Sequence, residues 1–115
     1  QEIAYMVNQI YTIEHNQGDV CKLFDHSDPQ YQDFQILCEQ YYYHKPHGIH
    51  HGHLSEHWRL IQCVFGVCVL YDPDGREIEF SRDNKLQIVI PPQWKVAWEN
   101  MSGKAVVIVK ECKKN

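Results

Sequence analysis

The sequence lacks the features that mark membrane, secreted or multidomain proteins. No window approaches the ~18 uncharged apolar residues of a membrane-spanning helix, so no membrane partner is expected. The first ten residues show no basic flank followed by an apolar core, so no signal peptide is visible, although a start at Gln1 leaves a removed leader open. No linker-like or repetitive stretch divides the 115 residues, which therefore predict one domain spanning residues 1–115.

Basic residues are also scarce. Eleven Lys and Arg against fifteen Asp and Glu give a formal net charge of −4. A nucleic-acid-binding surface usually needs a basic stripe, so no nucleic-acid partner is expected. The basic cluster near the end of the chain indicates a solubilising tail; it consists of Lys104, Lys110, Lys113 and Lys114.

Cysteine is present without the spacing of a metal or redox motif. The five cysteines are an odd number and contain no CxxC pair: Cys21, Cys38, Cys63, Cys68 and Cys112. Cys63 and Cys68 lie inside an apolar run and are interpreted as small core residues. This usage predicts a reduced, cytoplasmic protein.

Short apolar stretches separated by turn formers run through the chain and predict an all-β domain. Strands are expected within residues 3–13, 20–24, 34–43, 59–71, 76–80, 86–90, 94–98 and 105–109. The stretch 59–71 is expected to bend, or to divide into two strands, at Gly66. The DPDG sequence at 72–75 is a strong turn signal with Asp72 as its cap. Strands at this spacing without a convincing helix indicate an antiparallel sandwich or barrel.

Histidine is the unusual abundance, because six of the eight histidines fall between His44 and His57. On an extended chain His51 and His53 share one face and His50 points to the other. Imidazole is both a good metal ligand and a base near neutral pH. A metal site, a catalytic histidine and an inert polar loop are therefore all open interpretations of this segment.

Residues 91–100 resemble the second motif of the cupins. Pro91 and Asn100 occupy their motif positions, whereas Gln93 stands at the glycine position and Val96 at the histidine position. The resemblance implies an antiparallel β-barrel of the cupin (jelly-roll) type.

The metal ligands of the cupins are only partly retained. The first motif can be placed on His51 and His53, but Glu56 stands one place before the expected glutamate. Since a valine at position 96 cannot coordinate a metal, no tightly bound ion and no cofactor are expected. If that expectation fails, His51 and His53 are the predicted ligands.

Within the cupins, three segments resemble the dTDP-4-dehydrorhamnose 3,5-epimerases of the RmlC-like group. They are HGIH (47–50), RLIQCVFGV (59–67) and IPPQWKVAW (90–98). The resemblance implies an RmlC-like cupin domain and an isomerase or epimerase that acts, without a metal, on a nucleotide-linked 4-keto-6-deoxy sugar. The implied reaction removes a proton from the carbon next to the ketone of the sugar, and the nucleotide is expected to be dTDP.

The resemblance also assigns roles to individual residues. His50 stands where the family has its catalytic base, and Arg59 where a lysine holds the developing enolate. We expect His50 to point into the barrel, with Arg59 on a neighbouring strand aimed at the same cavity. The family's tyrosine acid has no counterpart in AVVIVKEC (105–112).

A second group, the sugar 3,4-ketoisomerases, is similar in its GIHHGH-like element and in a tyrosine-rich strand before it. That strand makes Tyr43 the candidate third catalytic residue, although Tyr41, Tyr42 and Tyr43 could equally pack both faces of a sheet.

The remaining site candidates are assigned to substrate binding. They are His47, His53, Trp94 and Trp98. The two tryptophans could line the barrel mouth and stack on a base, or could serve core packing or a dimer interface. A homodimer is expected from the resemblance and the apolar N-terminal strand. The alternative function is a non-catalytic cupin that binds a sugar nucleotide, or a metal through the His50–His53 cluster.

Overall fold

The computed structural model describes residues 11–14, 34–51, 54–84 and 86–114. These residues form nine antiparallel strands. Their bounds are β1 (Tyr11–Glu14), β2 (Phe34–His44), β3 (Ile49–His51), β4 (Trp58–Phe65), β5 (Val67–Tyr71), β6 (Glu77–Ser81), β7 (Leu86–Ile90), β8 (Ala97–Asn100) and β9 (Ala105–Lys114). Within the described part, no helix has the length and apolar character needed to cross a membrane.

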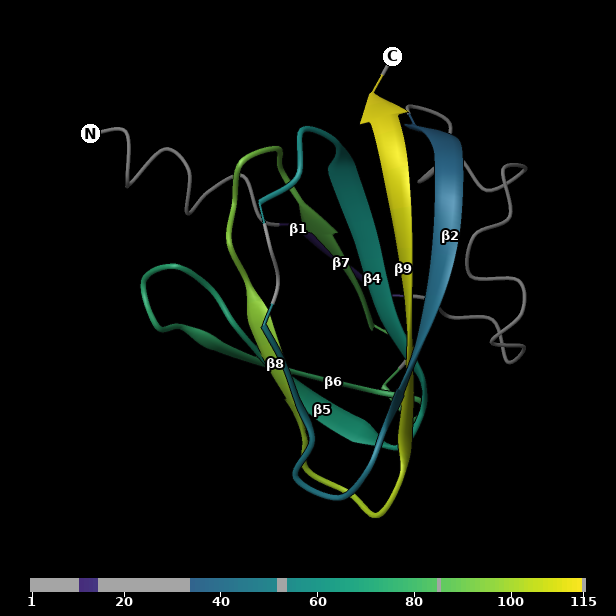
Figure 1. Cartoon of the computed structure of the whole chain (residues 1–115), viewed down its shortest axis with the longest axis vertical. Helices are drawn as coiled ribbons and strands as arrows, with labels where there is room; N and C mark the ends of the chain where they lie inside the picture. Colours follow the sequence, from purple (N-terminus) through teal and green to yellow (C-terminus); the bar gives the residue numbers. More distant parts are fainter. Residues whose placement is uncertain (1–10, 15–33, 52–53, 85, 115) are drawn as a thin grey trace.

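The strands divide between two facing sheets (Figure 1). The larger sheet has the order β1-β7-β4-β9-β2, and the smaller has the order β3-β8-β5-β6. From β2 onward the chain passes repeatedly between the two sheets, so that strands distant in sequence become neighbours. This is a jelly-roll arrangement, and the predicted antiparallel all-β barrel is confirmed.

Several strands lie where the sequence places them. Residues 86–90 form β7, residues 34–44 form β2, and the stretch 59–71 is divided at Gly66 into β4 and β5. The prediction for residues 94–98 is partly wrong, because β8 begins only at Ala97 after a turn. The predicted strand at 20–24 and most of the one at 3–13 lie outside the described residues.

Gly66 makes the sharp transition between the sheets possible. Its φ of +83° falls in the left-handed region, where a side chain is strained. A Cβ at this position would lie 2.3 Å from the Lys104 carbonyl oxygen and 2.6 Å from Ser102 Oγ. Glycine is therefore required here for both conformation and space.

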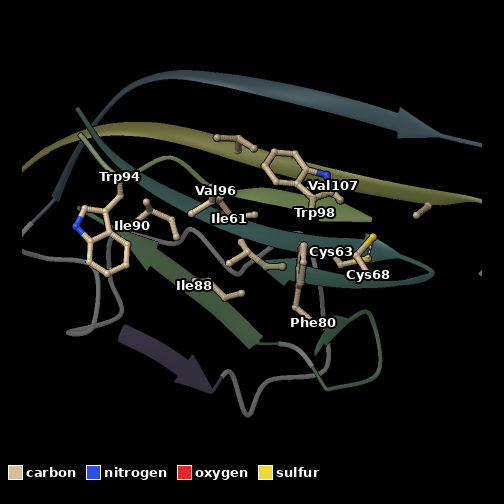
Figure 2. Packing of buried hydrophobic residues seen from close by; sticks show 13 residues of the cluster. Ile61, Cys63, Cys68, Phe80, Ile88, Ile90, Trp94, Val96, Trp98 and Val107 are labelled. Atoms are coloured by element: carbon tan, nitrogen blue, oxygen red, sulfur yellow. Dashed lines mark hydrogen bonds between the residues drawn. The ribbon is translucent and has the colours of Figure 1, made fainter. Parts of the chain in front are cut away.

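The space between the sheets is filled mainly by apolar side chains (Figure 2). Alternate, inward-pointing residues of β4, β7 and β9 contribute most of the apolar side chains of this core. Figure 2 labels ten of its members, which are Ile61, Cys63, Cys68, Phe80, Ile88, Ile90, Trp94, Val96, Trp98 and Val107. The prediction that Cys63 and Cys68 are core residues is confirmed, because both are fully buried.

Asn100 ties two turns together at one end of the barrel. Its side-chain nitrogen donates to the Lys45 carbonyl oxygen at 2.8 Å, and its Oδ1 accepts from the backbone N–H of Ser102 at 2.9 Å. Asn100 is fully buried, so each of these polar atoms needs a partner. The motif asparagine therefore has a structural role in this chain.

Candidate functional site

A small polar cavity opens between the sheets, beside the apolar core. Its lining comes from β2, β3, β4, β8, β9 and the segment before β4, and consists of Gln40, Tyr42, His50, Ser55, Arg59, Trp98, Val109 and Glu111. The strand period of two explains the selection, since Gln40 and Tyr42 lie on one face of β2. Residues between 40 and 59 and residues between 98 and 111 thus meet at one site.

His50 lies in an aromatic environment on the smaller sheet. Its ring stacks on the indole of Trp98, with centroids 4.1 Å apart and an interplanar angle of 21°. The two residues are directly paired across β3 and β8. The ring of Tyr42 approaches His50 from the larger sheet at 4.4 Å between centroids. His50 is therefore oriented from two sides and faces the cavity.

His44 supports this aromatic group from β2. The Trp98 indole nitrogen donates a hydrogen bond to His44 Nε2 at 2.9 Å. An acceptor nitrogen must carry no proton, so the imidazole is neutral in this arrangement. Burial lowers the pKa of His44, which favours the same neutral form.

Arg59 supplies a positive charge on the opposite wall. It is only 6% exposed, and its guanidinium donates to the Trp94 carbonyl oxygen. Burial lowers the pKa of Arg59, while the neighbouring Glu111 raises it. Because guanidinium remains protonated even when partly desolvated, Arg59 is a fixed cation in the cavity wall.

Glu111 is directly opposite Arg59 in the pairing of β4 with β9. Its two carboxylate oxygens accept hydrogen bonds from Cys38 Sγ at 3.1 Å and from Ser55 Oγ at 2.9 Å. These bonds hold the pKa of Glu111 below its ordinary value, the Cys38 bond contributing most. The same bond raises the pKa of the Cys38 thiol. Glu111 is thus an anion that balances the charge of Arg59.

Tyr42 is the tyrosine that faces the cavity. Its hydroxyl donates to Gln40 Oε1 at 2.7 Å. Burial raises the pKa of Tyr42, with Glu111 adding to the effect, so the phenol keeps its proton. A protonated phenol near an imidazole and a guanidinium is equipped to give a proton.

The cavity is small in this form of the protein. Its volume is about 30 Å³, which is room for a water molecule. A hexose ring would enter only if a lining side chain moved. Ser55, one of the lining residues, is held by two hydrogen bonds. Besides the Ser55–Glu111 bond, the Gln93 backbone N–H donates to the Ser55 carbonyl oxygen at 2.8 Å.

The two central residues predicted from sequence are brought together, but not as neighbours in one sheet. His50 is on β3 of the smaller sheet and Arg59 on β4 of the larger sheet, so they face each other across the cavity. Their proposed catalytic roles stay predictions.

The structure does not bring Tyr43 to this cavity. Tyr43 is 77% exposed and lies on the outer face of β2, pointing away from the cavity. The three consecutive tyrosines alternate between faces, and only the middle one, Tyr42, points inward. Sequence alone does not reveal which phase of the alternation faces the barrel.

The predicted substrate-binding residues are scattered. Trp98 lines the cavity, whereas Trp94 is only 2% exposed within the apolar core and cannot stack on a base without unfolding. His47 is exposed in the turn after β2, with a φ of +59°. His53 lies outside the described residues. Trp94 and His47 are therefore not part of the cavity.

The positions of the cupin metal ligands are occupied differently here. Val96 is buried in the core, and His51 is exposed on the face of β3 opposite His50. Among the described residues, no three His, Cys, Asp or Glu side chains are grouped closely enough to hold a metal ion. Gln93 has a φ of +65°, which explains why glycine is usual at its motif position.

Sequence reasoning missed Gln40, Ser55 and Glu111. Glu111 offered the clearest signal, since it is an acidic residue on the inward phase of the apolar strand AVVIV extended by two residues. Ser55 and Gln40 carry no comparable signal, because polar residues in loops and edge strands are common.

Comparison with solved structures shows which proteins have a similar fold. The chain resembles a dTDP-4-dehydrorhamnose 3,5-epimerase from Sulfolobus tokodaii with a TM-score of 0.69 at 12% identity, over 92% of this chain and 70% of that one. It resembles a dTDP-6-deoxy-D-glucose-3,5-epimerase (RmlC) from Legionella pneumophila, in complex with dTDP-4-keto-L-rhamnose, with a TM-score of 0.61 at 16% identity, over 70% and 50% of the two chains.

An RmlC-like cupin from Shewanella frigidimarina is similar as well, with a TM-score of 0.54 at 13% identity, over 68% of this chain and 73% of that one. No family model and no curated protein matches the sequence. The chain spans about half the length of several of the epimerases, such as that from Elizabethkingia anophelis, of which 51% is covered. The domain has the RmlC-type cupin fold, and the predicted resemblance in fold is confirmed.

Proposed function

We propose that this domain is an isomerase or epimerase for a nucleotide-linked, dTDP-type 4-keto-6-deoxy sugar. The observation that carries the proposal is the meeting of His50 and Arg59 across one cavity in a fold shared with dTDP-sugar epimerases. Proton abstraction next to a ketone needs a base and a cation near the developing oxyanion, and these two side chains supply both.

The proposed chemistry uses three side chains and no cofactor. His50 takes the proton from the carbon next to the ketone, and the C–H electron pair moves into the C–C bond as the carbonyl π electrons move to oxygen. Arg59 stabilises the resulting enolate oxygen. Tyr42, in place of Tyr43, returns a proton to the enolate. The phenolate is then reprotonated from solvent, and His50 releases the proton that it took to solvent.

The site of proton return decides the product. Delivery to the same carbon from the opposite face inverts that centre and gives an epimer. Delivery to the former carbonyl carbon, with loss of the neighbouring hydroxyl proton, moves the ketone by one position. The cavity holds groups for either outcome, so the reaction class is an isomerisation by way of an enolate.

The small size of the cavity means that the protein must rearrange when a sugar ring binds. Only the sugar ring is expected to approach His50, with the nucleotide outside the barrel. Because the resting volume is about 30 Å³, entry of the ring requires the lining side chains to move apart. We further propose that the working protein is a cytoplasmic homodimer.

Hydrogen exchange into the sugar tests the proposed function. Incubating the protein with a dTDP-4-keto-6-deoxy sugar in D₂O should incorporate deuterium at the carbon next to the ketone. NMR of the sugar measures this incorporation over time. His50→Asn should reduce the exchange rate by about 10²–10⁴-fold. His51→Asn is the matched control, since His51 is the next residue of β3 and points away from the cavity. An inactive wild-type protein, or an active His50→Asn variant, would refute the proposal.

The second candidate is a non-catalytic cupin that binds a sugar nucleotide. The small resting cavity favours it, since a hexose does not fit without rearrangement. A thermal shift with dTDP in the absence of any deuterium exchange would support this candidate over the isomerase.

A further inference from the structure

Cys63 and Cys68 form a close pair of thiols in the apolar core, and neither lines the polar cavity (Figure 2). Their sulfur atoms lie 3.9 Å apart, and both side chains are fully buried. Both are free thiols in this structure. The sulfur atoms of a disulfide bond are about 2 Å apart, so an approach of about 2 Å would join the two side chains.

The chain brings these two thiols together through the corner at Gly66. Cys63 lies near the end of β4 in the larger sheet, and Cys68 is the second residue of β5 in the smaller sheet. The corner is fixed by its neighbours, because the Gly66 carbonyl oxygen accepts a hydrogen bond from the Arg82 N–H at 3.2 Å. A disulfide would therefore connect the two sheets across a corner that the fold already holds in place.

The surroundings of the two sulfur atoms determine which thiol ionises first. The hydrogen bond with Cys68 lowers the pKa of the Cys63 thiol most, and backbone hydrogen bonds with Phe65 and Arg82 lower it further, against the effect of burial. The same bond with Cys63, together with burial, raises the pKa of the Cys68 thiol. Because the thiolate is the reactive form of cysteine, Cys63 is the first thiol to be oxidised.

We propose that Cys63 and Cys68 are a site of reversible oxidation, at which hydrogen peroxide converts the two thiols to a disulfide. The Cys63 sulfur attacks one peroxide oxygen, the O–O bond breaks, and the released hydroxide takes the Cys63 proton, which leaves a sulfenic acid and water. The Cys68 sulfur then attacks the Cys63 sulfur, the S–O bond breaks, and the departing hydroxide takes the Cys68 proton and leaves as water. The net reaction oxidises two thiols and reduces one peroxide to two water molecules.

A small dithiol reductant reverses the reaction by thiol–disulfide exchange. In a reducing compartment, such a disulfide is a transient, redox-sensing link rather than a permanent one. The inference concerns the apolar core and does not depend on the proposed isomerase activity.

The segment between the two cysteines gives peroxide a route to them. Phe65 is 50% exposed and Gly66 is half-buried, although the cysteines on either side are fully buried. A local opening of this corner therefore brings solvent to the pair without unfolding the barrel. Hydrogen peroxide is little larger than water, so a small opening is sufficient.

Peptide mapping of the full chain tests the disulfide. The native protein is treated with hydrogen peroxide, the peroxide is removed with catalase, and the remaining thiols are alkylated after denaturation. Trypsin releases both cysteines in one peptide, residues 60–76, because no Lys or Arg lies between Arg59 and Arg76. By mass spectrometry, this peptide should carry no alkyl group and lack two hydrogen atoms, and it should take up two alkyl groups when dithiothreitol precedes alkylation. Chymotrypsin cleaves after Phe65 and should leave the two sides joined.

Alanine variants test the order of the two steps. In Cys68→Ala no disulfide can form, so dimedone should trap the sulfenic acid of Cys63. In Cys63→Ala the adduct at Cys68 should be about tenfold less abundant, because the Cys68 thiol is the weaker nucleophile. Cys112→Ala is the matched control, since Cys112 is also fully buried, and it should form the disulfide as wild type does.

The peroxide concentration is raised until the exposed Cys38 is oxidised. A peptide 60–76 that still holds both thiols at that point would overturn the inference, as would a disulfide from either cysteine to a third one. Irreversible oxidation of Cys63 in wild type, without a disulfide, would do the same. Equal trapping in the two alanine variants would refute the assignment of Cys63 as the first thiol. The wild-type peptide map decides the pairing by itself, even where a core substitution prevents folding.

Discussion

Glu111 shows how one side chain connects three parts of the site. Cys38 from β2 and Ser55 from the segment before β4 both donate to it, and it lies opposite Arg59 in the sheet. Each donor stabilises the ionised carboxylate rather than the acid. The charge that holds the Ser55 segment over the cavity is therefore sensitive to acid.

We predict that this carboxylate contributes a pH-dependent part of the stability. The pKa of Glu111 in the folded protein lies below its ordinary value of 4.5, so the stabilisation is present above that pH and is lost as the pH falls through the lowered pKa. The free energy of unfolding of wild type should fall toward that of Glu111→Gln on acidification, measured by urea denaturation across a pH series.

Glu79→Gln is the control, since Glu79 is exposed on β6. Its difference from wild type should not vary with pH to the same degree. A wild-type advantage over Glu111→Gln that stays constant into strong acid would contradict the assignment.

The residue types of the site were more predictable than their orientation. The resemblance of HGIH (47–50) and RLIQCVFGV (59–67) to the epimerases selected His50 and Arg59, and both residues line the cavity. Tyr42, and not the predicted Tyr43, faces the cavity, because alternation determines which residues share a face and not which face is inside. Glu111 was missed because its partners, Cys38 and Ser55, come from segments distant in sequence.

At the scale of elements, the connections carry as much information as the strands. Gly66 and Gly75 both have φ near +80°, yet they stand in different surroundings. Gly66 is pressed against the turn that contains Ser102 and Lys104, whereas nothing lies within 4 Å of a Cβ built on Gly75. Conformation and packing can thus be separated with two equivalent substitutions.

We predict that Gly66→Ala destabilises the protein much more than Gly75→Ala. The change at Gly75 should cost about 1–2 kcal/mol from backbone conformation alone. Gly66→Ala adds a contact of 2.3 Å with a backbone oxygen that cannot rotate away, and should cost more than about 3 kcal/mol. Denaturant unfolding measures both, and equal effects would show that the turn at 102–104 yields to the added methyl group.

The elements themselves followed closely from local patterns. The apolar stretch LQIVI and the DPDG turn lie where they were predicted, because buried β-branched runs and Pro-Gly turns have few alternatives. Residues 94–96 have no regular secondary structure, although Trp94 and Val96 are buried. Burial of this segment comes from contacts with the core, and a local pattern does not distinguish such a buried irregular segment from a strand.

Across the whole molecule, the interior is divided into two regions of opposite character. Most of the space between the sheets is apolar, and Val96 belongs to that part where the cupin motif has a histidine. The polar region is the cavity with one histidine, one arginine and one carboxylate in its lining. The charge of Glu111 is balanced there by Arg59, which repels a cation from the same space.

The last prediction is that the protein retains no tightly bound metal ion at the barrel site. His50 stacks on Trp98 within a cavity that also holds the Arg59 cation, and His51 on the same strand points outward. Protein purified without a His-tag or nickel resin should contain substoichiometric metal by mass spectrometry, and EDTA should leave its thermal midpoint unchanged, since an ion bound to the folded state would stabilise it. Stoichiometric metal that is lost in His51→Ala would show that His51 and His53 form a site after all.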